Sequence, residues 1–139
     1  MVASAYLEKC HDGGMIVGKL RGTVAVVDDD ASLRRSVGRL LYAYGFPAIE
    51  YQSAEAFLGR DPNILIDCLV LDIDLGGMSG IELQHKLKEA GSKLPVIFIT
   101  ALEDPHLKIQ AERAGCVAYL RKPFAGVGLI DAVKKAIGS

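Results

Sequence analysis

The chain has 139 residues, of which half are apolar, 16 are basic and 17 are acidic. This length fits one domain with a substantial hydrophobic core, and the formal net charge of −1 argues against nucleic-acid binding driven by bulk electrostatics. No apolar run is long enough to span a bilayer, and the three cysteines lack metal-ligand spacing, which favours a reducing, cytoplasmic setting.

Residues 1–21 have weak hydrophobic periodicity and contain three glycines, so we interpret them as a flexible leader before a domain at 22–139. The run Cys10-His11-Asp12 contains the residue types of a catalytic trio. These residues are consecutive and have no scaffold, and a solvated tail is the better interpretation.

The first strand is predicted at Thr23–Val27, a β-branched apolar run that ends in three aspartates. The third of them, Asp30, can cap the helix that follows. The first two, Asp28 and Asp29, repel each other and are best tolerated where a cation or solvent compensates their charge. The residues alone leave a metal site and a solvated acidic loop equally open.

The second and third strands are predicted at Pro47–Tyr51 and Cys68–Leu71. Proline donates no ladder hydrogen bond, which favours an edge position for the former. The latter is apolar throughout and predicts a strand buried on both faces that delivers Asp72 to a glycine-rich loop. Taken alone, Asp72 is explained more simply as a loop or helix cap than as a reacting group.

The next helix is predicted to begin at the capping box formed by Ser79 and Glu82. A fourth strand at 95–101 carries Thr100 near its end, and Asp104-Pro105 predicts the start of another helix.

The fifth strand is predicted at Cys116–Leu120, shortly before Lys122, and a last helix with an apolar stripe follows. Five strands thus alternate with five helices, which predicts an α/β fold: a doubly wound, flavodoxin-like (βα)5 arrangement with a five-stranded parallel sheet.

In such a fold the carboxyl ends of the strands share one edge of the sheet. Three carboxylates there can hold a hard divalent cation, and magnesium fits best when a phosphate completes the shell. A hydroxyl and an ammonium group add donors for phosphoryl oxygens. The sequence therefore predicts a site for moving a phosphoryl group, built from Asp28, Asp29, Asp72, Thr100 and Lys122.

This pattern resembles the receiver domains of two-component response regulators, including the single-domain chemotaxis regulator and the receivers of nitrogen-fixation regulators. In that family an acidic pair follows the first strand, an aspartate the third, Thr or Ser the fourth, and Lys-Pro the fifth. All four features occur here in order, and the resemblance covers about residues 23–138.

The resemblance implies that Asp72 accepts a phosphoryl group from a histidine kinase or a histidine phosphotransfer protein. The chain would catalyse its own phosphorylation and dephosphorylation and no other reaction. A magnesium or manganese ion would be held by Asp28, Asp29, Asp72 and the backbone carbonyl of Asp74.

The resemblance also implies that Thr100 and Lys122 bind phosphoryl oxygens, that Tyr119 is an aromatic switch, and that the bond before Pro123 is cis. The residues themselves leave both of the last two open. A tyrosine also suits a half-buried strand, and few bonds before proline are cis.

The loop after Asp72 departs from the family pattern. A glycine pair, Gly76-Gly77, replaces the usual stiffening proline, and we expect a more mobile loop. Asp74 adds a carboxylate two residues past the acceptor, and we expect it to alter the lifetime of the phosphoaspartate or the affinity for metal.

The sequence shows no output domain after the last helix, so we expect a stand-alone regulator or a phosphorelay shuttle. A segment of a longer regulator would have the same sequence. By resemblance, 104–114, 116–120 and 126–138 would form the surface for a homodimer or for an unknown output protein.

Two alternatives remain. Asp72-Ile73-Asp74 also resembles the Asp-x-Asp motif of haloacid-dehalogenase-like phosphatases, although that motif normally follows the first strand and Gly76 does not fit its continuation. The other alternative is a receiver-like module that binds partners without being phosphorylated. The complete set of strand-end residues argues against it.

Overall fold

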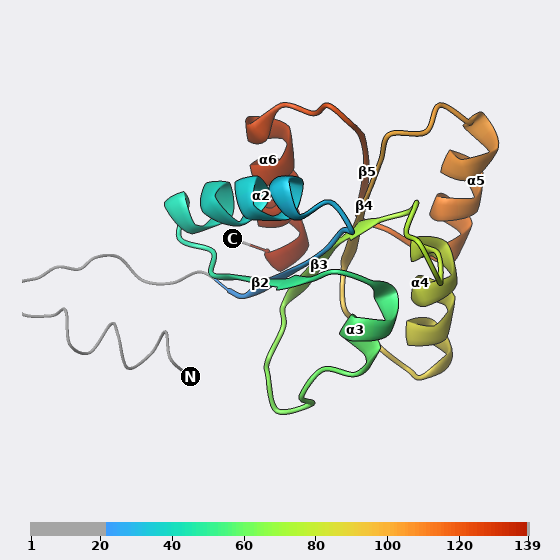
Figure 1. Ribbon diagram of the computed structural model, residues 1–139, viewed down its shortest axis with the longest axis horizontal. Coiled ribbons are helices and arrows are strands. Elements are labelled where there is room, and N and C mark those ends of the chain that lie inside the picture. Colours follow the sequence, from blue (N-terminus) through green and yellow to red (C-terminus); the bar gives the residue numbers. More distant parts are fainter. Residues whose placement is uncertain (1–21, 139) are drawn as a thin grey trace, which may run out of the picture.

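Five strands lie side by side in the order β2-β1-β3-β4-β5, and all neighbouring pairs are parallel (Figure 1). The structure, a computed structural model, describes residues 22–138, so the predicted leader at 1–21 lies outside the described residues. The elements in chain order are β1 (Val24–Val27), α2 (Ala31–Ala43), β2 (Ala48–Tyr51), α3 (Ala54–Leu58), β3 (Cys68–Asp72), α4 (Gly80–Glu89), β4 (Val96–Thr100), α5 (Pro105–Ala114), β5 (Ala118–Arg121) and α6 (Gly126–Ile137).

The sheet separates two hydrophobic cores. Helices α2 and α6 cover one face, and α3, α4 and α5 cover the other (Figure 1). Successive residues of β1 and β3 point into opposite cores: Val26 and Val70 pack under α2 and α6, while Val27 and Leu71 pack under the other three helices. Every residue of β1, β3 and β4 is buried, as expected for a parallel sheet covered on both faces. The predicted doubly wound α/β fold is confirmed.

The predicted capping residues also have their expected partners. The Asp30 carboxylate accepts hydrogen bonds from the backbone N–H groups of Ser32 and Leu33, and the capping box of Ser79 and Glu82 is complete. Gly45 follows α2 with φ +90°, the left-handed conformation that glycine adopts without a Cβ penalty.

The ends of two strands differ from prediction. β4 ends at Thr100, and β5 begins at Ala118 instead of Cys116. Gly115, at φ +98°, turns the chain out of α5, and Val117 is the first residue afterwards whose N–H reaches β4, at the Val96 carbonyl. Among residues 22–138, no helix has the length and apolar character needed to cross a bilayer.

The register of β1 and β3 places the site. Val27 of β1 lies opposite Leu71 of β3. The residues that follow them, Asp28 and Asp72, therefore emerge together at the carboxyl edge of the sheet. The strand order also reverses at β1. Helix α2, which follows β1, covers one face of the sheet, and α4, which follows the neighbouring strand β3, covers the other. Ligand sites of open α/β sheets lie at such a point.

Candidate functional site

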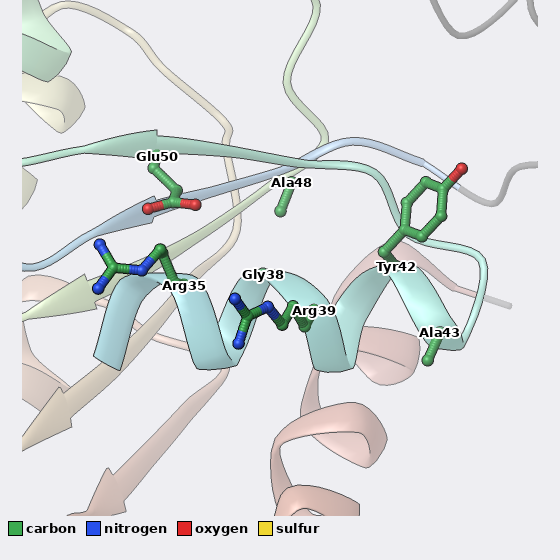
Figure 2. Close-up of a pocket in the computed structure, with 7 residues that line it drawn as sticks. All are labelled: Arg35, Gly38, Arg39, Tyr42, Ala43, Ala48 and Glu50. Atoms are coloured by element: carbon green, nitrogen blue, oxygen red, sulfur yellow. The ribbon is translucent and has the colours of Figure 1, made fainter. Parts of the chain in front are cut away.

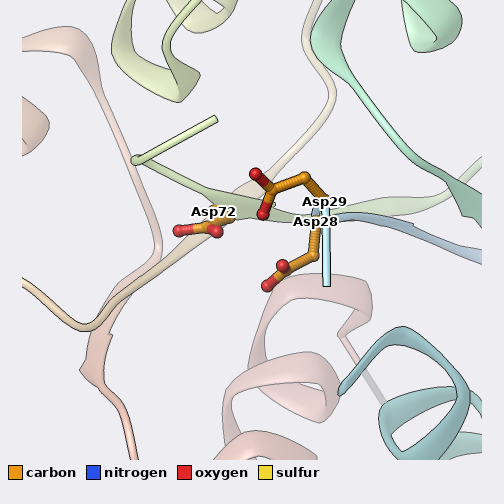
Figure 3. A group of neighbouring side chains, drawn as sticks. All are labelled: Asp28, Asp29 and Asp72. Carbon is orange, nitrogen blue, oxygen red and sulfur yellow. The ribbon is translucent and has the colours of Figure 1, made fainter. Parts of the chain in front are cut away.

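Three aspartates from two strand ends gather at this edge (Figure 3). Asp28, Asp29 and Asp72 each offer a carboxylate oxygen, and these atoms all lie within 4.8 Å of one another. Asp28 is fully buried and Asp72 is 3% exposed, whereas Asp29 is exposed to solvent. Carboxylate oxygens are the ligands that hard divalent cations prefer, so this cluster has the composition of a metal site.

Asp28 and Asp72 are held by the same pattern of hydrogen bonds. In each, Oδ1 accepts the N–H of the residue two positions later: Asp30 N donates to Asp28 over 2.9 Å, and Asp74 N donates to Asp72 over 3.1 Å. The other oxygen of each carboxylate, Oδ2, accepts from Lys122 Nζ, at 2.8 Å for Asp28 and 3.2 Å for Asp72. One ammonium group therefore bridges two buried carboxylates from different strands.

The electrostatics follow from this burial. Desolvation, together with the negative charge of Asp28, raises the pKa of Asp72 to about 6, although Lys122 and the Asp74 N–H oppose the shift. Burial disfavours the charged form of Lys122, but hydrogen bonds and attraction from Asp28 and Asp72 outweigh that effect and raise the pKa of Lys122. Asp72 is therefore largely ionised at neutral pH, and the site holds more negative than positive charge.

Thr100 is fully buried at the end of β4, one residue beyond Ile99, which lies opposite Asp72. Its Oγ1 accepts a hydrogen bond from the N–H of Leu102 over 3.0 Å, so it is engaged with its own loop. Tyr119 lies half-buried in β5, packed against the core under α5. The peptide bond between Lys122 and Pro123 is cis.

A hollow of about 260 Å³ opens above the acidic cluster. Asp74 is exposed on its rim. The residues that line it are Asp28, Asp29, Asp30, Asp72, Asp74, Leu75, Gly76, Ala101 and Lys122. The hollow therefore gives a small ligand access to the buried carboxylates.

A larger hollow, of about 440 Å³, lies between α2 and the edge strand β2 (Figure 2). Arg35 and Arg39 extend from α2 on either side of Gly38, and Glu50 is the one carboxylate in its lining. It does not bring several carboxylates together around a lysine, as the smaller hollow does. The chemistry therefore belongs to the smaller hollow.

Two residues that support the site were not predicted. Arg34 Nη1 donates to the backbone carbonyl of Asp28 over 2.7 Å, while Arg34 Nε donates to Glu50 of β2. Gly80 opens α4 directly against β3, and a Cβ there would overlap the Asp72 carbonyl oxygen. A glycine at a helix start can signal such a close approach, whereas nothing in the pattern of α2 distinguishes Arg34 from its neighbour Arg35.

A third supporting residue, Glu55 of α3, was also not predicted to contact the loop after β3. The glycine pair predicted a mobile loop, but Leu75 is buried in the core and the N–H of Met78 donates to Glu55 Oε2 of α3 over 2.9 Å. An acid in the first turn of a helix is already explained by the helix dipole, so nothing in the sequence indicated that Glu55 also makes this longer-range contact.

Comparison with known proteins agrees with this geometry. A family model described as the response regulator receiver domain matches residues 24–134. The chain belongs to the receiver domain family of response regulators. Membership disfavours the phosphatase alternative, whose motif normally follows the first strand, whereas Asp72 is the last residue of β3.

Relatives of this receiver domain include transcriptional regulators. The transcriptional regulatory protein TdiR of Thauera aromatica is 40% identical over 115 residues, which cover 83% of this chain and 51% of TdiR. The transcriptional regulatory protein FixJ of Bradyrhizobium diazoefficiens is 35% identical over 117 residues, covering 84% of this chain and 57% of FixJ. The chain thus spans little more than half the length of these relatives.

Solved structures share the fold. The crystal structure of FixJ-N matches with a TM-score of 0.77 and 34% identity, covering 88% of this chain and 96% of that one. A response regulator receiver protein from Burkholderia phymatum matches with a TM-score of 0.74 and 44% identity, covering 84% and 95% respectively.

Proposed function

We propose that this receiver domain accepts a phosphoryl group on Asp72 from a histidine kinase or a histidine phosphotransfer protein and signals through a change in its surface. The observation that carries the proposal is the bridge from Lys122 to two buried carboxylates, Asp28 and Asp72, at a solvent-accessible hollow. Burying several like charges is costly unless they are paired, and such a cluster is a common feature of functional sites.

The proposed reaction is a direct displacement at phosphorus. A carboxylate oxygen of Asp72 forms the new P–O bond while the P–N bond to the donor histidine breaks, and the histidine nitrogen keeps the electron pair and takes up a proton. With its pKa raised only to about 6, Asp72 is ionised at neutral pH and needs no separate base. The chain catalyses only its own phosphorylation and dephosphorylation.

The residues present fit a divalent cation, because three oxygen donors already lie within 4.8 Å of one another. Magnesium, or manganese, would be held by Asp28, Asp29, Asp72 and the backbone carbonyl of Asp74. The bound ion would neutralise charge on the transferring phosphoryl oxygens. Lys122, already between Asp28 and Asp72, would pair with a phosphoryl oxygen as a fixed positive charge.

Thr100 would carry the signal away from the site. Its hydroxyl would move to donate a hydrogen bond to a phosphoryl oxygen, and this movement would break the bond that it accepts from the Leu102 N–H and release the loop between β4 and α5. Tyr119 would then turn inward. The surface of α5, β5 and α6 would then change shape and serve either as a homodimer interface or as a docking site for an output protein. We place the protein in the cytoplasm and expect no direct contact with nucleic acid.

The test is incubation of the purified chain with acetyl phosphate and Mg²⁺, followed by mass measurement of the wild type and of Asp72→Asn. A phosphoryl adduct on the wild type alone is expected. Continuous release of free phosphate without an adduct would favour the phosphatase alternative. The absence of both would favour a binding module that is not phosphorylated.

A further inference from the structure

Helix α3 holds the loop that leaves the proposed phosphorylation site. Glu55, in the first turn of α3, accepts a hydrogen bond from the N–H of Met78, 23 residues later in the chain. The helix itself is anchored, because Ser53 Oγ caps it by accepting from Ala56 N over 2.9 Å and Phe57 is fully buried. Glu55 therefore presents its carboxylate from a fixed support.

The two glycines of the loop differ sharply in their surroundings. A Cβ on Gly77 would lie 2.7 Å from Oε2 and 3.2 Å from Oε1 of Glu55, whereas a Cβ on Gly76 would meet nothing within 4 Å. Neither glycine is among those with positive φ, so both positions accept alanine as far as backbone conformation is concerned. A methyl group on Gly77 would therefore push the Glu55 carboxylate away from its present position beside Met78.

This contact completes a series of attachments along the loop. At its start, Asp74 N donates to the Asp72 carboxylate, and Leu75 is buried. At its end, Gly80 N donates to the carbonyl of Ile73 over 3.0 Å. Between these points the Glu55 contact ties Met78 to α3. Glu55 is exposed to solvent, and the hydrogen bond from the Met78 N–H lowers the pKa of its carboxyl group.

We propose that Glu55 is a positioning residue for the Asp72 site, acting through a clasp formed by Glu55, Gly77 and Met78. The proposal rests on the proposed function, because what the clasp positions is the loop that carries the Asp74 carbonyl and lines the hollow with Asp74 and Gly76. Without the clasp the loop samples more conformations, and its carbonyl is no longer held ready for a cation.

The first experiment measures hydrogen exchange of the Met78 amide by NMR in the metal-free protein. Glu55→Ala and Gly77→Ala are each expected to increase its exchange rate several-fold. Gly76→Ala is the matched control for adding a methyl group to the loop. It is expected to leave the Met78 amide protected, and Glu55→Gln, which keeps an acceptor oxygen, is expected to restore most of the protection.

The second experiment measures Mg²⁺ affinity of the same variants by calorimetric titration. Glu55→Ala and Gly77→Ala are expected to weaken binding by similar factors, and the double variant no more than either alone, because both remove one contact. Glu55→Gln is expected to bind nearly as well as the wild type.

Several results would overturn the proposal. Equal exchange at Met78 in Gly76→Ala and Gly77→Ala, or in Glu55→Ala and the wild type, would show that the clasp is not responsible. Faster exchange with unchanged Mg²⁺ affinity would leave Glu55 without a positioning role. Failure of the wild type to accept a phosphoryl group would instead count against the proposed function, and the exchange and Mg²⁺ data would still decide the role of Glu55.

Discussion

The two sides of the sheet's carboxyl edge are held in different ways. On the side of β1 and β3, Asp28 and Asp72 are buried and both oxygens of each have a hydrogen-bond donor. On the side of β4 and β5, residues 101–104 are exposed, and the ion pair between Arg121 and Glu103 joins side chains that are 47% and 74% exposed. Exposed pairs of this kind contribute only about 0–1 kcal/mol.

The difference indicates that one side is fixed in place and the other can rearrange. The acidic side is built before any ligand arrives, whereas the loop after β4 can be rearranged at little cost. Under the proposed function, a few new charge-assisted bonds to a phosphoryl group would change the population of such a loop. The following predictions test whether the contrast between the two sides is real.

The largest effect is expected from removing the bridge on the acidic side. Lys122→Met leaves Asp28 and Asp72 facing each other without a counter-charge, which should lower the free energy of unfolding at pH 7 by about 3–5 kcal/mol. Urea denaturation measures this, with Lys135→Met, on the exposed face of α6, as the control. Mg²⁺ should recover part of the loss. A variant as stable as the control would mean that the bridge is not a major support.

A second prediction concerns pH. The pKa of Asp72 rises from 3.8 to about 6 on folding, so the folded state binds this proton more tightly than the unfolded state. Its contribution to stability therefore declines as pH rises from about 4 to about 6 and stays low above that range. In the metal-free protein, Asp72→Asn should lack this decline and gain up to about 3 kcal/mol over the wild type at pH 7. Equal stability of the two proteins from pH 4 to pH 7 would contradict the prediction.

Gly80 tests how closely α4 must approach β3. Gly80→Ala places a methyl group on the Asp72 carbonyl oxygen and should cost about 1–3 kcal/mol while reducing phosphorylation. Gly128→Ala, in α6, is the matched control, since its Cβ would meet nothing within 4 Å and alanine favours a helix by about 0.5–1 kcal/mol. If both substitutions stabilised the protein to the same degree, the close approach at Gly80 would not matter.

Asp74 lies where the acidic side meets solvent, and a smaller effect is expected there. Asp74→Asn removes an exposed charge beside the cluster and should change the decay rate of the phosphoaspartate or the Mg²⁺ dissociation constant severalfold. Asp131→Asn, an exposed acid on α6, serves as the control. The prediction fails if Asp74→Asn leaves both quantities at their wild-type values.

The smallest effect is expected on the other side of the edge. Arg121→Ala breaks the ion pair with Glu103 and should change the free energy of unfolding by less than about 1 kcal/mol. A loss as large as that of Lys122→Met, measured under the same conditions, would remove the distinction between the two sides.

Much of the fold could be predicted from the sequence because its signals are local. The apolar runs at Val24–Val27 and Cys68–Asp72 and the caps at Asp30 and Ser79 all became the expected elements. The position of the acids at strand ends then followed from a parallel sheet, in which those ends share one edge. The functional roles assigned to these residues remain predictions.

What could not be predicted depends on side chains that meet across long stretches of sequence. Nothing in the pattern near Lys122 tells that its ammonium group lies between two carboxylates. The same holds for the Glu55 contact to Met78, which also shows that a glycine pair can serve close packing as well as flexibility. Such contacts are set by distances and rotamers in the finished fold, which hydrophobic periodicity does not encode.

The bridge also bears on how the protein is made. Lys122 lies 94 residues after Asp28 and 50 residues after Asp72, and β5 directly precedes it. During synthesis both aspartates leave the ribosome long before their shared counter-ion, and domains generally fold as units once their chain is available. A nascent chain that has not reached Lys122 therefore contains both aspartates without their shared counter-ion, so the bridge forms only once the last strand of the sheet has been made.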